Sequence, residues 1–416
     1  MNPLDDHTIV TPLSDRTVIT RHTDDDSTHM ALTVGPTSQH LPDDADHLDD
    51  RTRITRSAEL GNHTRATSTD AIGSRACLEE LTDITSSSSS DSLLTTNEIK
   101  RHAEALIANI ARVVLDKEPV IRLCVVTMLA QGHVLLEDQP GTGKTQLAKA
   151  LAASVNISCK RIQFTPDLMP SDIIGTSIYN QHDSSFRFRR GPVFASIVLA
   201  DEINRAPAKT QAALLEVMEE EQVTADGATR MVPKPFMVIA TQNPPNHQGT
   251  YRLPDAQLDR FTTTVAIGPP SHQASLQLVQ QSHIRNRAAS LRPIIDADML
   301  IRMQRSVQQT HVDDAIAEYI VRLNEHIRHH EAVAAGPSIR GCLALTRLSQ
   351  AWASCQGRDY VVPDDMQPLI APALAHRLTL TQTALFDGVT AKDITEHALQ
   401  HVPSPTGLEI IGGRRS

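Results

Sequence analysis

The stretch EDQPGTGKTQL, residues 137–147, contains residue types that can hold a phosphate chain. In the pattern GxxxxGK(S/T), Gly143, Lys144 and Thr145 stand at their expected positions. The lysine would neutralise β and γ phosphate oxygens, and the threonine hydroxyl would bind Mg²⁺. Asp138 stands where the first glycine is expected, which costs little if its side chain points outward at the start of the loop. The stretch therefore predicts a phosphate-binding loop.

The backbone of this loop would do most of the binding. Gly141 and Gly143 allow backbone N–H groups to turn inward on the phosphates, and the following helix would add its N-terminal dipole. The alternative is a strand-to-helix turn that is rich in glycine by chance. The candidate nucleotide-binding residues are Asp138, Gln139, Pro140, Gly141, Thr142, Gly143, Lys144, Thr145 and Gln146.

An acidic pair follows a second apolar segment. Residues Ile197–Ala200 are mostly apolar and lead directly to Asp201 and Glu202. An aspartate here can bind the Mg²⁺ water shell, and a glutamate can polarise the attacking water. A solvated pair at the start of a loop is the alternative. We therefore expect Thr145 and Asp201 at the metal and Glu202 as the catalytic base.

A third apolar segment, FMVIATQNP at Phe236–Pro244, ends in Asn243. Its amide could orient the same water molecule. Alone, an asparagine before two prolines would be a turn residue. Because it follows a phosphate loop and an acidic pair, we interpret Asn243 as a sensor of the nucleotide.

These side chains need strands and helices to position them. His133–Glu137 predicts a short buried strand, and Thr145–Val155 predicts a helix, which gives the strand, loop and helix that a phosphate loop requires. Upstream, Glu98–Leu115 carries an apolar face at helical spacing, and a second helix is expected at about Pro119–Ala130.

From Ser271 to about Leu380, helical periods recur without convincing strands. We therefore predict an all-helical second domain. Its expected helices are Ala274–Ala289, Ala297–Gln308, Asp313–His330, Ile339–Gln356 and Pro363–Leu380.

Composition separates the first 95 of the 416 residues from the remainder. Residues 1–95 hold 17 acidic and seven basic residues and no aromatic residue, whereas the rest of the chain is balanced in charge. Such a segment buries too little apolar surface to offset chain entropy, so we predict disorder. A docking arm, a solvated leader and a wrongly assigned start are the alternatives.

The remaining composition predicts a soluble, cytoplasmic protein. The five cysteines show no CxxC spacing, which favours reduced thiols. No apolar run approaches the roughly 18–20 residues that span a bilayer.

Four segments together resemble the MoxR family of AAA+ ATPases: GTGKT, LADEINRAP, VIATQNP and GTYRLPDAQLDRF. The likeness covers about residues 97–380, and residues 164–180 resemble the extra segment that this family inserts before its acidic strand. It implies an α/β fold with an AAA+ P-loop domain built on a parallel sheet, followed by an all-helical lid domain. The expected domains are a disordered tail (1–95), the ATPase core (96–270), the lid (271–402) and a C-terminal tail (403–416).

The resemblance also implies rings, usually hexamers, with ATP and Mg²⁺ at each subunit junction. Arg260, in LDRF, matches the arginine that reaches the neighbour's γ-phosphate, although a surface ion pair with Asp255 or Asp259 is the alternative. Arg340 ends GPSIR, which is similar to the family's GASPR, and would be a second sensor. A helix arginine that faces solvent is its alternative.

The function implied by the resemblance is that of a chaperone-like remodeller or maturation factor. Its partners would be proteins with von Willebrand factor A domains, and its clients would include enzymes that need cofactor or metal insertion. ATP rather than another nucleotide is likewise implied by the family. A nucleic-acid-stimulated motor and a non-hydrolysing, nucleotide-gated scaffold are the alternatives.

Two further segments bear on partners. Residues 219–236 predict a hairpin that turns at Ala225–Gly227, because Asp-Gly is a strong local hairpin signal. It matches the family's pore-facing pre-sensor hairpin, and a plain surface hairpin is the alternative. Basic and aromatic residues alternate at Phe186, Arg187, Phe188, Arg189 and Arg190. In a domain of balanced charge we interpret this run as part of a subunit junction and do not expect nucleic acid there.

Overall fold

The computed structural model describes residues 92–138, 141–182, 184–242, 253–281, 284 and 286–406. They belong to one compact unit of the chain, Cys77–Ser416. The predictions for residues 1–91, for residues 407–416 and for Asn243 lie outside the described residues. The domain boundaries stay a prediction.

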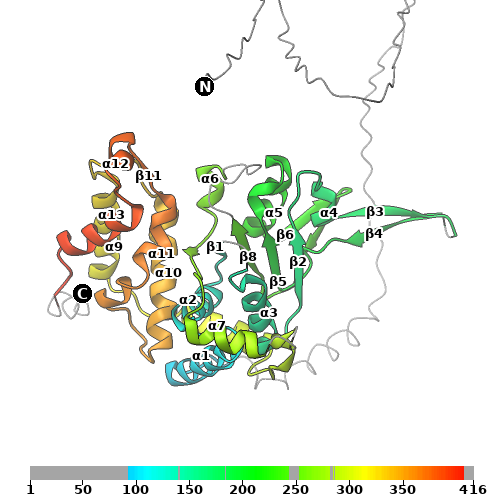
Figure 1. Ribbon diagram of the computed structural model, residues 1–416, viewed down its shortest axis with the longest axis horizontal. Coiled ribbons are helices and arrows are strands. Elements are labelled where there is room, and N and C mark those ends of the chain that lie inside the picture. The colour runs from blue at the N-terminus through cyan, green and yellow to red at the C-terminus, as the bar shows by residue number, and fades with distance from the viewer. Residues whose placement is uncertain are drawn as a thin grey trace, which may run out of the picture. The chain divides into compact units, whose positions relative to one another are not determined.

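A five-stranded parallel sheet forms the centre of the first half of the described structure (Figure 1). Its strand order is β2-β5-β8-β1-β9. The strands are β1 (Val134–Glu137), β2 (Cys159–Gln163), β5 (Ile197–Asp201), β8 (Met237–Gln242) and β9 (Thr263–Val265). Gln163 lies opposite Asp201, and Glu137 lies opposite Gln242. This register brings the carboxyl ends of four strands to one edge, where the polar residues gather.

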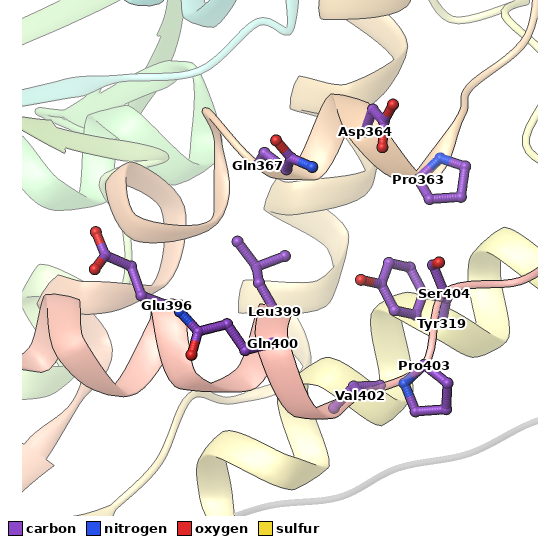
Figure 2. Close-up of a pocket in the computed structure, with 10 residues that line it drawn as sticks. All are labelled: Tyr319, Pro363, Asp364, Gln367, Glu396, Leu399, Gln400, Val402, Pro403 and Ser404. Carbon is purple, nitrogen blue, oxygen red and sulfur yellow. The ribbon is translucent and has the colours of Figure 1, made fainter.

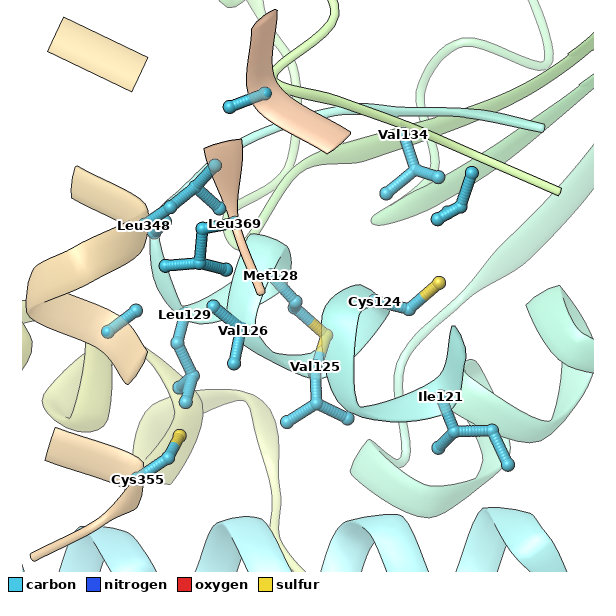
Figure 3. Close-up of a cluster of buried hydrophobic side chains, with 14 of the residues drawn as sticks. Ile121, Cys124, Val125, Val126, Met128, Leu129, Val134, Leu348, Cys355 and Leu369 are labelled. Atoms are coloured by element: carbon cyan, nitrogen blue, oxygen red, sulfur yellow. The ribbon is translucent and has the colours of Figure 1, made fainter. Parts of the chain in front are cut away.

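Apolar side chains from both faces of the sheet are buried, as expected for parallel strands. On one face, Leu136 and Leu199 pack in a cluster with the first three helices and with lid helices. These helices are α1 (Thr96–Ala111), α2 (Glu118–Leu129) and α3 (Lys144–Val155). Figure 3 shows the side chains of α2 in this cluster beside Leu348 and Leu369, so core and lid share buried apolar contacts.

The opposite face of the sheet packs against α5. Leu135 and Val198 join a second apolar cluster with Leu214 and Leu215 of this helix. The elements on this side and at the strand ends are α4 (Pro170–Ile174), the 3₁₀ helix η1 (Ile203–Arg205), α5 (Ala208–Glu220) and α6 (Asp255–Leu258). Helices on both faces therefore fix the sheet that carries the candidate site.

The first helix is shorter than its apolar pattern predicts. It begins after Thr95, which forms a reciprocal capping box with Glu98. It ends at Ala111 instead of Leu115, because Val113 and Val114 turn into the core cluster.

Two hairpins extend from this first half. β3 (Gly175–Asn180) pairs antiparallel with β4 (Ser185–Arg190), in the segment that resembles the family insert. β6 (Gln222–Ala225) pairs with β7 (Ala228–Met231), which confirms the hairpin predicted from Asp-Gly. Asp226 and Gly227 both have positive φ, as a tight hairpin turn requires. The Arg230 guanidinium lies 3.9 Å from the Phe188 ring centroid, so the two hairpins contact each other.

The second half is mainly helical. Its helices are α7 (His272–Gln280), α8 (Ala297–Val307), α9 (Asp314–Arg328), α10 (Ile339–Cys355), α11 (Ile370–Leu374), α12 (Gln382–Phe386) and α13 (Ala391–His401), with 3₁₀ helices η2 (Arg287–Ser290), η3 (Pro363–Met366) and η4 (Ala375–Arg377). The expectation of no strands is wrong in one detail, because β10 (Val333–Ala335) pairs with β11 (Thr379–Leu380).

Two predicted lid helices are shorter in the structure. The predicted helix Ala274–Ala289 ends at Gln280, where its apolar period stops. The predicted helix Pro363–Leu380 is divided into η3, α11, η4 and β11. Pro368 lies between η3 and α11, and proline supplies no N–H for a continuous helix. Across the described helices, none is both long and apolar enough to cross a bilayer.

Candidate nucleotide-binding site

The phosphate loop connects β1 to α3. Gly141 and Gly143 have φ values of +90° and +95°, and a Cβ at either position would meet no atom within 4 Å. Their backbone conformation, and not a lack of space, therefore requires glycine. Gly143 is the N-cap of α3 and has no side chain with which to cap it. The first N–H groups of α3 are thus available to an anion.

Lys144 is buried at the first position of α3 and has an intramolecular acceptor. Its Nζ donates to the Asp138 carbonyl oxygen at 2.7 Å. Burial lowers the pKa of Lys144, whereas the nearby charges of Asp138, Asp201 and Glu202 act in the opposite direction. A phosphate oxygen could replace the Asp138 carbonyl as acceptor and would add a negative charge beside the ammonium group.

One cavity joins the phosphate loop to the acidic pair. Its volume is about 350 Å³. Its lining residues are Gly141, Gly143, Lys144, Thr145, Gln146, Arg161, Gln163, Asp201 and Glu202. Two segments about 55 positions apart in the sequence, the loop and the end of β5, therefore face the same space. This is the arrangement that the sequence predicts for phosphoryl transfer.

Asp201 is held by two neighbouring strands. Its Oδ1 accepts a hydrogen bond from Thr241 Oγ1 at 2.7 Å. Its Oδ2 accepts from Arg161 Nε at 3.0 Å and from Arg161 Nη2 at 2.5 Å. The carboxylate is therefore fixed in orientation at the edge of the cavity.

Glu202 has a backbone conformation that is rare for a residue with a side chain. Its φ is +56° and its ψ is +49°, which is a sparsely populated region held in place by surrounding contacts. The Glu202 N–H donates to Thr241 Oγ1 at 2.8 Å. Its carboxylate accepts from Gln163 Nε2 at 3.1 Å and lies 3.2 Å from Arg205 Nη1. These contacts hold the carboxylate beside the phosphate loop.

Sequence reasoning missed Arg161, Gln163 and Thr241. Arg161 and Gln163 are exposed residues of β2, and nothing in their sequence neighbourhood distinguishes them from other exposed strand residues. The available signal is their spacing of two, which places both side chains on one face of a strand. Only the pairing of β2 with β5 shows that this face meets the acidic pair. Thr241 lies two residues before Asn243 and is hidden within an apolar strand.

Asp138 does not point outward, contrary to the sequence prediction. It is half-buried, and its Oδ2 accepts a hydrogen bond from the Gly268 N–H at 2.7 Å. The geometry of Gln139, Pro140 and Asn243, which were also predicted to bind or sense nucleotide, lies outside the described residues.

Arg260 and Arg340 meet at a second place, between core and lid. The Arg260 Nε lies 2.9 Å from Glu219 Oε2, and Arg340 Nη2 pairs with the other oxygen of the same carboxylate. The hydrogen bond from Arg260 is the main cause that lowers the pKa of Glu219. Arg260 thus pairs with Glu219 and not with Asp255 or Asp259, the two alternatives that its sequence neighbours suggested.

The cavity around these arginines has a volume of about 340 Å³. It shares no lining residue with the cavity at the phosphate loop. The structure therefore brings Arg260 and Arg340 together with each other but not with the phosphate loop of their own chain.

A larger cavity lies in the lid and is not the nucleotide site. It has a volume of about 520 Å³ and lies among side chains of α9, η3 and α13, including Tyr319, Asp364 and Glu396 (Figure 2). Its lining contains none of the predicted site residues and no lysine or arginine that could neutralise phosphate. Chemistry, and not volume, therefore identifies the candidate site.

The oxygen donors in the cavity at the phosphate loop fit Mg²⁺. The Thr145 hydroxyl and the Asp201 carboxylate supply hard oxygen atoms, and both residues line the cavity. Mg²⁺ usually takes one or two such protein ligands and completes its shell with water and substrate phosphates. Elsewhere in the described ranges, no group of three or more His, Cys, Asp or Glu side chains has metal-binding geometry.

Comparison with known proteins agrees with this geometry. Residues 133–263 match the model of the ATPase family associated with various cellular activities (AAA), and residues 325–398 match that of the AAA lid domain. A crystal structure from Cytophaga hutchinsonii is 33% identical, with a TM-score of 0.70. That match covers 75% of this chain and 97% of the solved chain.

Curated relatives match this chain in sequence over most of their length. YeaC of Bacillus subtilis is 46% identical over 299 residues, covering 72% of this chain and 93% of YeaC. Chaperone MoxR1 of Mycobacterium tuberculosis is 40% identical over 311 residues, covering 73% and 82%. Protein MoxR of Paracoccus denitrificans is 30% identical over 305 residues, covering 68% and 88%. The chain therefore belongs to the MoxR family of AAA+ ATPases.

Proposed function

We propose that this protein hydrolyses ATP with the help of Mg²⁺. The observation that carries the proposal is the single cavity in which Lys144 and Thr145 face Asp201 and Glu202. The lysine and the helix N-terminus would bind phosphate oxygens. Thr145 and Asp201 would hold Mg²⁺, which would supply positive charge to neutralise the phosphates. The preference for adenine follows from the family and not from these contacts.

Glu202 acts as the base in this proposal. Its carboxylate takes a proton from the attacking water, and Gln163 and Arg205 keep the carboxylate in place through the contacts described above. Arg161 holds Asp201 in the same way. We further propose that Asn243, which follows β8 in the sequence, orients the water molecule.

The second cavity supports action between subunits. Arg260 and Arg340 lie apart from their own phosphate loop, so we propose that they reach the nucleotide of a neighbouring copy, where a planar cation stabilises transition-state charge. A homo-oligomeric ring, hexameric as in the family, supplies such a neighbour at every junction.

The biological role that fits such a ring is remodelling or maturation of other proteins. A relative that is 40% identical bears the name chaperone. We propose that ATP turnover changes the position of the lid and thereby acts on a client protein in the cytoplasm, with a protein that carries a von Willebrand factor A domain as adaptor.

The activity is tested by phosphate release with Mg²⁺ and by direct ATP binding, on the full chain. Lys144→Ala should abolish ATP binding, because it removes the charge that meets the phosphates. Glu202→Gln should bind ATP as the parent does and turn over at least about a hundredfold more slowly. Glu220→Gln, on an exposed residue without an assigned role, is the control and should match the parent.

Equal turnover of Glu202→Gln and the parent would show that another group is the base. Failure of the parent to retain ATP in Mg²⁺ would contradict the proposed function itself. The chaperone role is tested by capture with Glu202→Gln in ATP, where specific retention of a client and an adaptor is expected. Strong stimulation of turnover by DNA or RNA would instead favour a nucleic-acid motor.

A further inference from the structure

Asp138 takes the place of the first glycine of the phosphate-loop pattern, and three contacts converge on it. Its N–H donates to the Gln242 carbonyl oxygen at 3.4 Å, at the end of β8. Its own carbonyl accepts from Lys144 Nζ at 2.7 Å. Its carboxylate accepts from the Gly268 N–H at 2.7 Å. Asp138 therefore contacts Lys144 of the loop, the end of β8 and a distant segment of the chain.

That distant segment, Gly268–Ser271, is where the chain leaves β9 for α7. Gly268 has a φ of +69°, a conformation that favours glycine. Pro269 and Pro270 have no N–H, so the Gly268 N–H is the last backbone donor before Ser271. On its other side, the Pro269 carbonyl accepts from Lys117 Nζ at 2.7 Å. The segment is thus held at two points, the Gly268 N–H and the Pro269 carbonyl.

A glycine at position 138 could not make the contact with Gly268. The left-handed turns of the loop are supplied by Gly141 and Gly143, so the loop does not need a third glycine to form. The Asp138 side chain therefore adds a connection to a loop that is complete without it.

We propose that Asp138 is a positioning residue that couples the phosphate loop to the Gly268–Ser271 segment. The inference rests on the proposed binding of ATP. When a phosphate takes the Lys144 ammonium, the Asp138 carbonyl loses its charged donor, and the peptide adjusts. Because the side chain of the same residue holds Gly268, the adjustment reaches the point where the chain leaves the sheet. Occupancy of the nucleotide site is thereby transmitted toward the lid.

Amide hydrogen exchange of the full-length protein tests the contact without relying on turnover. In the nucleotide-free protein, Asp138→Ala and Asp138→Gly should each raise exchange at the Gly268 amide about fivefold, the loss expected for one hydrogen bond. Asp138→Asn should restore protection, because its Oδ1 can accept the same N–H. Asp116→Asn removes a nearby exposed carboxylate and should leave the Gly268 amide unchanged. Equal protection in Asp138→Ala and the parent would overturn the proposal.

The coupling is tested by repeating the measurement with a non-hydrolysable ATP analogue and Mg²⁺. In the parent, the analogue should change exchange over residues 266–271 by at least about threefold, and in Asp138→Ala it should not. Asp138→Ala should bind ATP within about threefold of the parent yet hydrolyse it about tenfold more slowly, and Asp138→Asn should recover most of that rate. An identical response of Asp138→Ala and the parent to the analogue would refute the coupling.

The two proposals fail in different ways. Loss of nucleotide binding by the parent contradicts the proposed ATPase, and the nucleotide-free exchange still decides whether Asp138 holds Gly268. A parent that hydrolyses ATP, together with an Asp138→Ala variant of equal rate and equal protection, contradicts the role of Asp138 alone.

Discussion

At the scale of single residues, Thr241 connects the two acidic side chains of the site. Its hydroxyl oxygen accepts from the Glu202 N–H at 2.8 Å and donates to Asp201 Oδ1 at 2.7 Å. The residue is fully buried, so the Glu202 N–H and Asp201 Oδ1 share one hydroxyl group away from water. It therefore holds the left-handed backbone of Glu202 and the carboxylate of Asp201 in a fixed relation.

Replacing Thr241 with valine should lower kcat about tenfold to a hundredfold with little change in ATP affinity, because the hydroxyl positions the acidic pair and not the phosphate loop. Thr241→Ser keeps the hydroxyl and should retain most of the rate. Steady-state phosphate release and equilibrium ATP binding measure the two quantities. A Thr241→Val protein that is folded and as active as Thr241→Ser would remove the positioning role.

Part of the candidate site could be predicted from sequence because its residues follow one another along the chain. Lys144 and Thr145 belong to one loop, and Asp201 and Glu202 are adjacent. Arg161 could not be predicted, since its role depends on β2 lying beside β5, and strand order is a property of the fold. The partner of Arg260 was missed for the same reason, because Glu219 is 41 positions away.

At the scale of elements, the sequence correctly predicts a turn that depends on two adjacent residues. It fails for a helix whose apolar spacing and whose prolines favour different structures. The Asp-Gly turn between β6 and β7 needs only two residues with positive φ, so the sequence is sufficient to predict it. The lid segment after Pro363 has apolar residues at helical spacing, but Pro368 lies at a break between two short helices. Strands β10 and β11 are too short for their pattern to be detected, and each is defined only by the other.

The short helix η4 ties the lid to the core through a half-buried histidine. His376 Nε2 donates to the Phe261 carbonyl at 3.0 Å. Desolvation by burial, followed by the charge of Arg377, lowers the pKa of His376 from 6.5 to about 3. This element therefore depends on a neutral imidazole.

Acid should destabilise the protein through this histidine. The folded state holds the pKa of His376 at about 3, and the unfolded chain has the ordinary value of 6.5, so the unfolded chain binds the proton first as pH falls. The contribution of the neutral His376 to the free energy of unfolding is complete above pH 6.5. It declines as the pH falls toward 3. Burial also lowers the pKa of His133, which adds a loss of the same sign.

The contribution of His376 is isolated by His376→Gln, whose side-chain amide can donate to the Phe261 carbonyl and does not titrate. Between pH 7.5 and 5.0 the parent should lose about 2 kcal/mol more unfolding free energy than the variant. Urea unfolding at the two pH values measures the difference. An equal pH dependence of both proteins would show that His376 does not titrate on unfolding.

At the scale of the whole molecule, core and lid are held together next to the arginine site. Arg377 of η4 lies 3.1 Å from Asp259 Oδ1, and the Ser338 hydroxyl donates to the other oxygen of that carboxylate at 2.9 Å. Asp259 directly precedes Arg260 in the chain. A change in lid position would therefore alter the surface that carries Arg260 and Arg340.

The proposed function requires that ATP is cleaved at a junction to which two copies of the chain contribute residues. Phosphate release from mixtures of Arg260→Ala and Glu202→Gln measures whether such a shared junction exists. Each variant alone should be nearly inactive, since one lacks the arginine offered to its neighbour and the other lacks the base. Mixed rings should regain activity, because a junction can combine Glu202 of one copy with Arg260 of the other. If mixing restores no activity although the subunits exchange, or if Arg260→Ala alone turns over like the parent, the claim is contradicted.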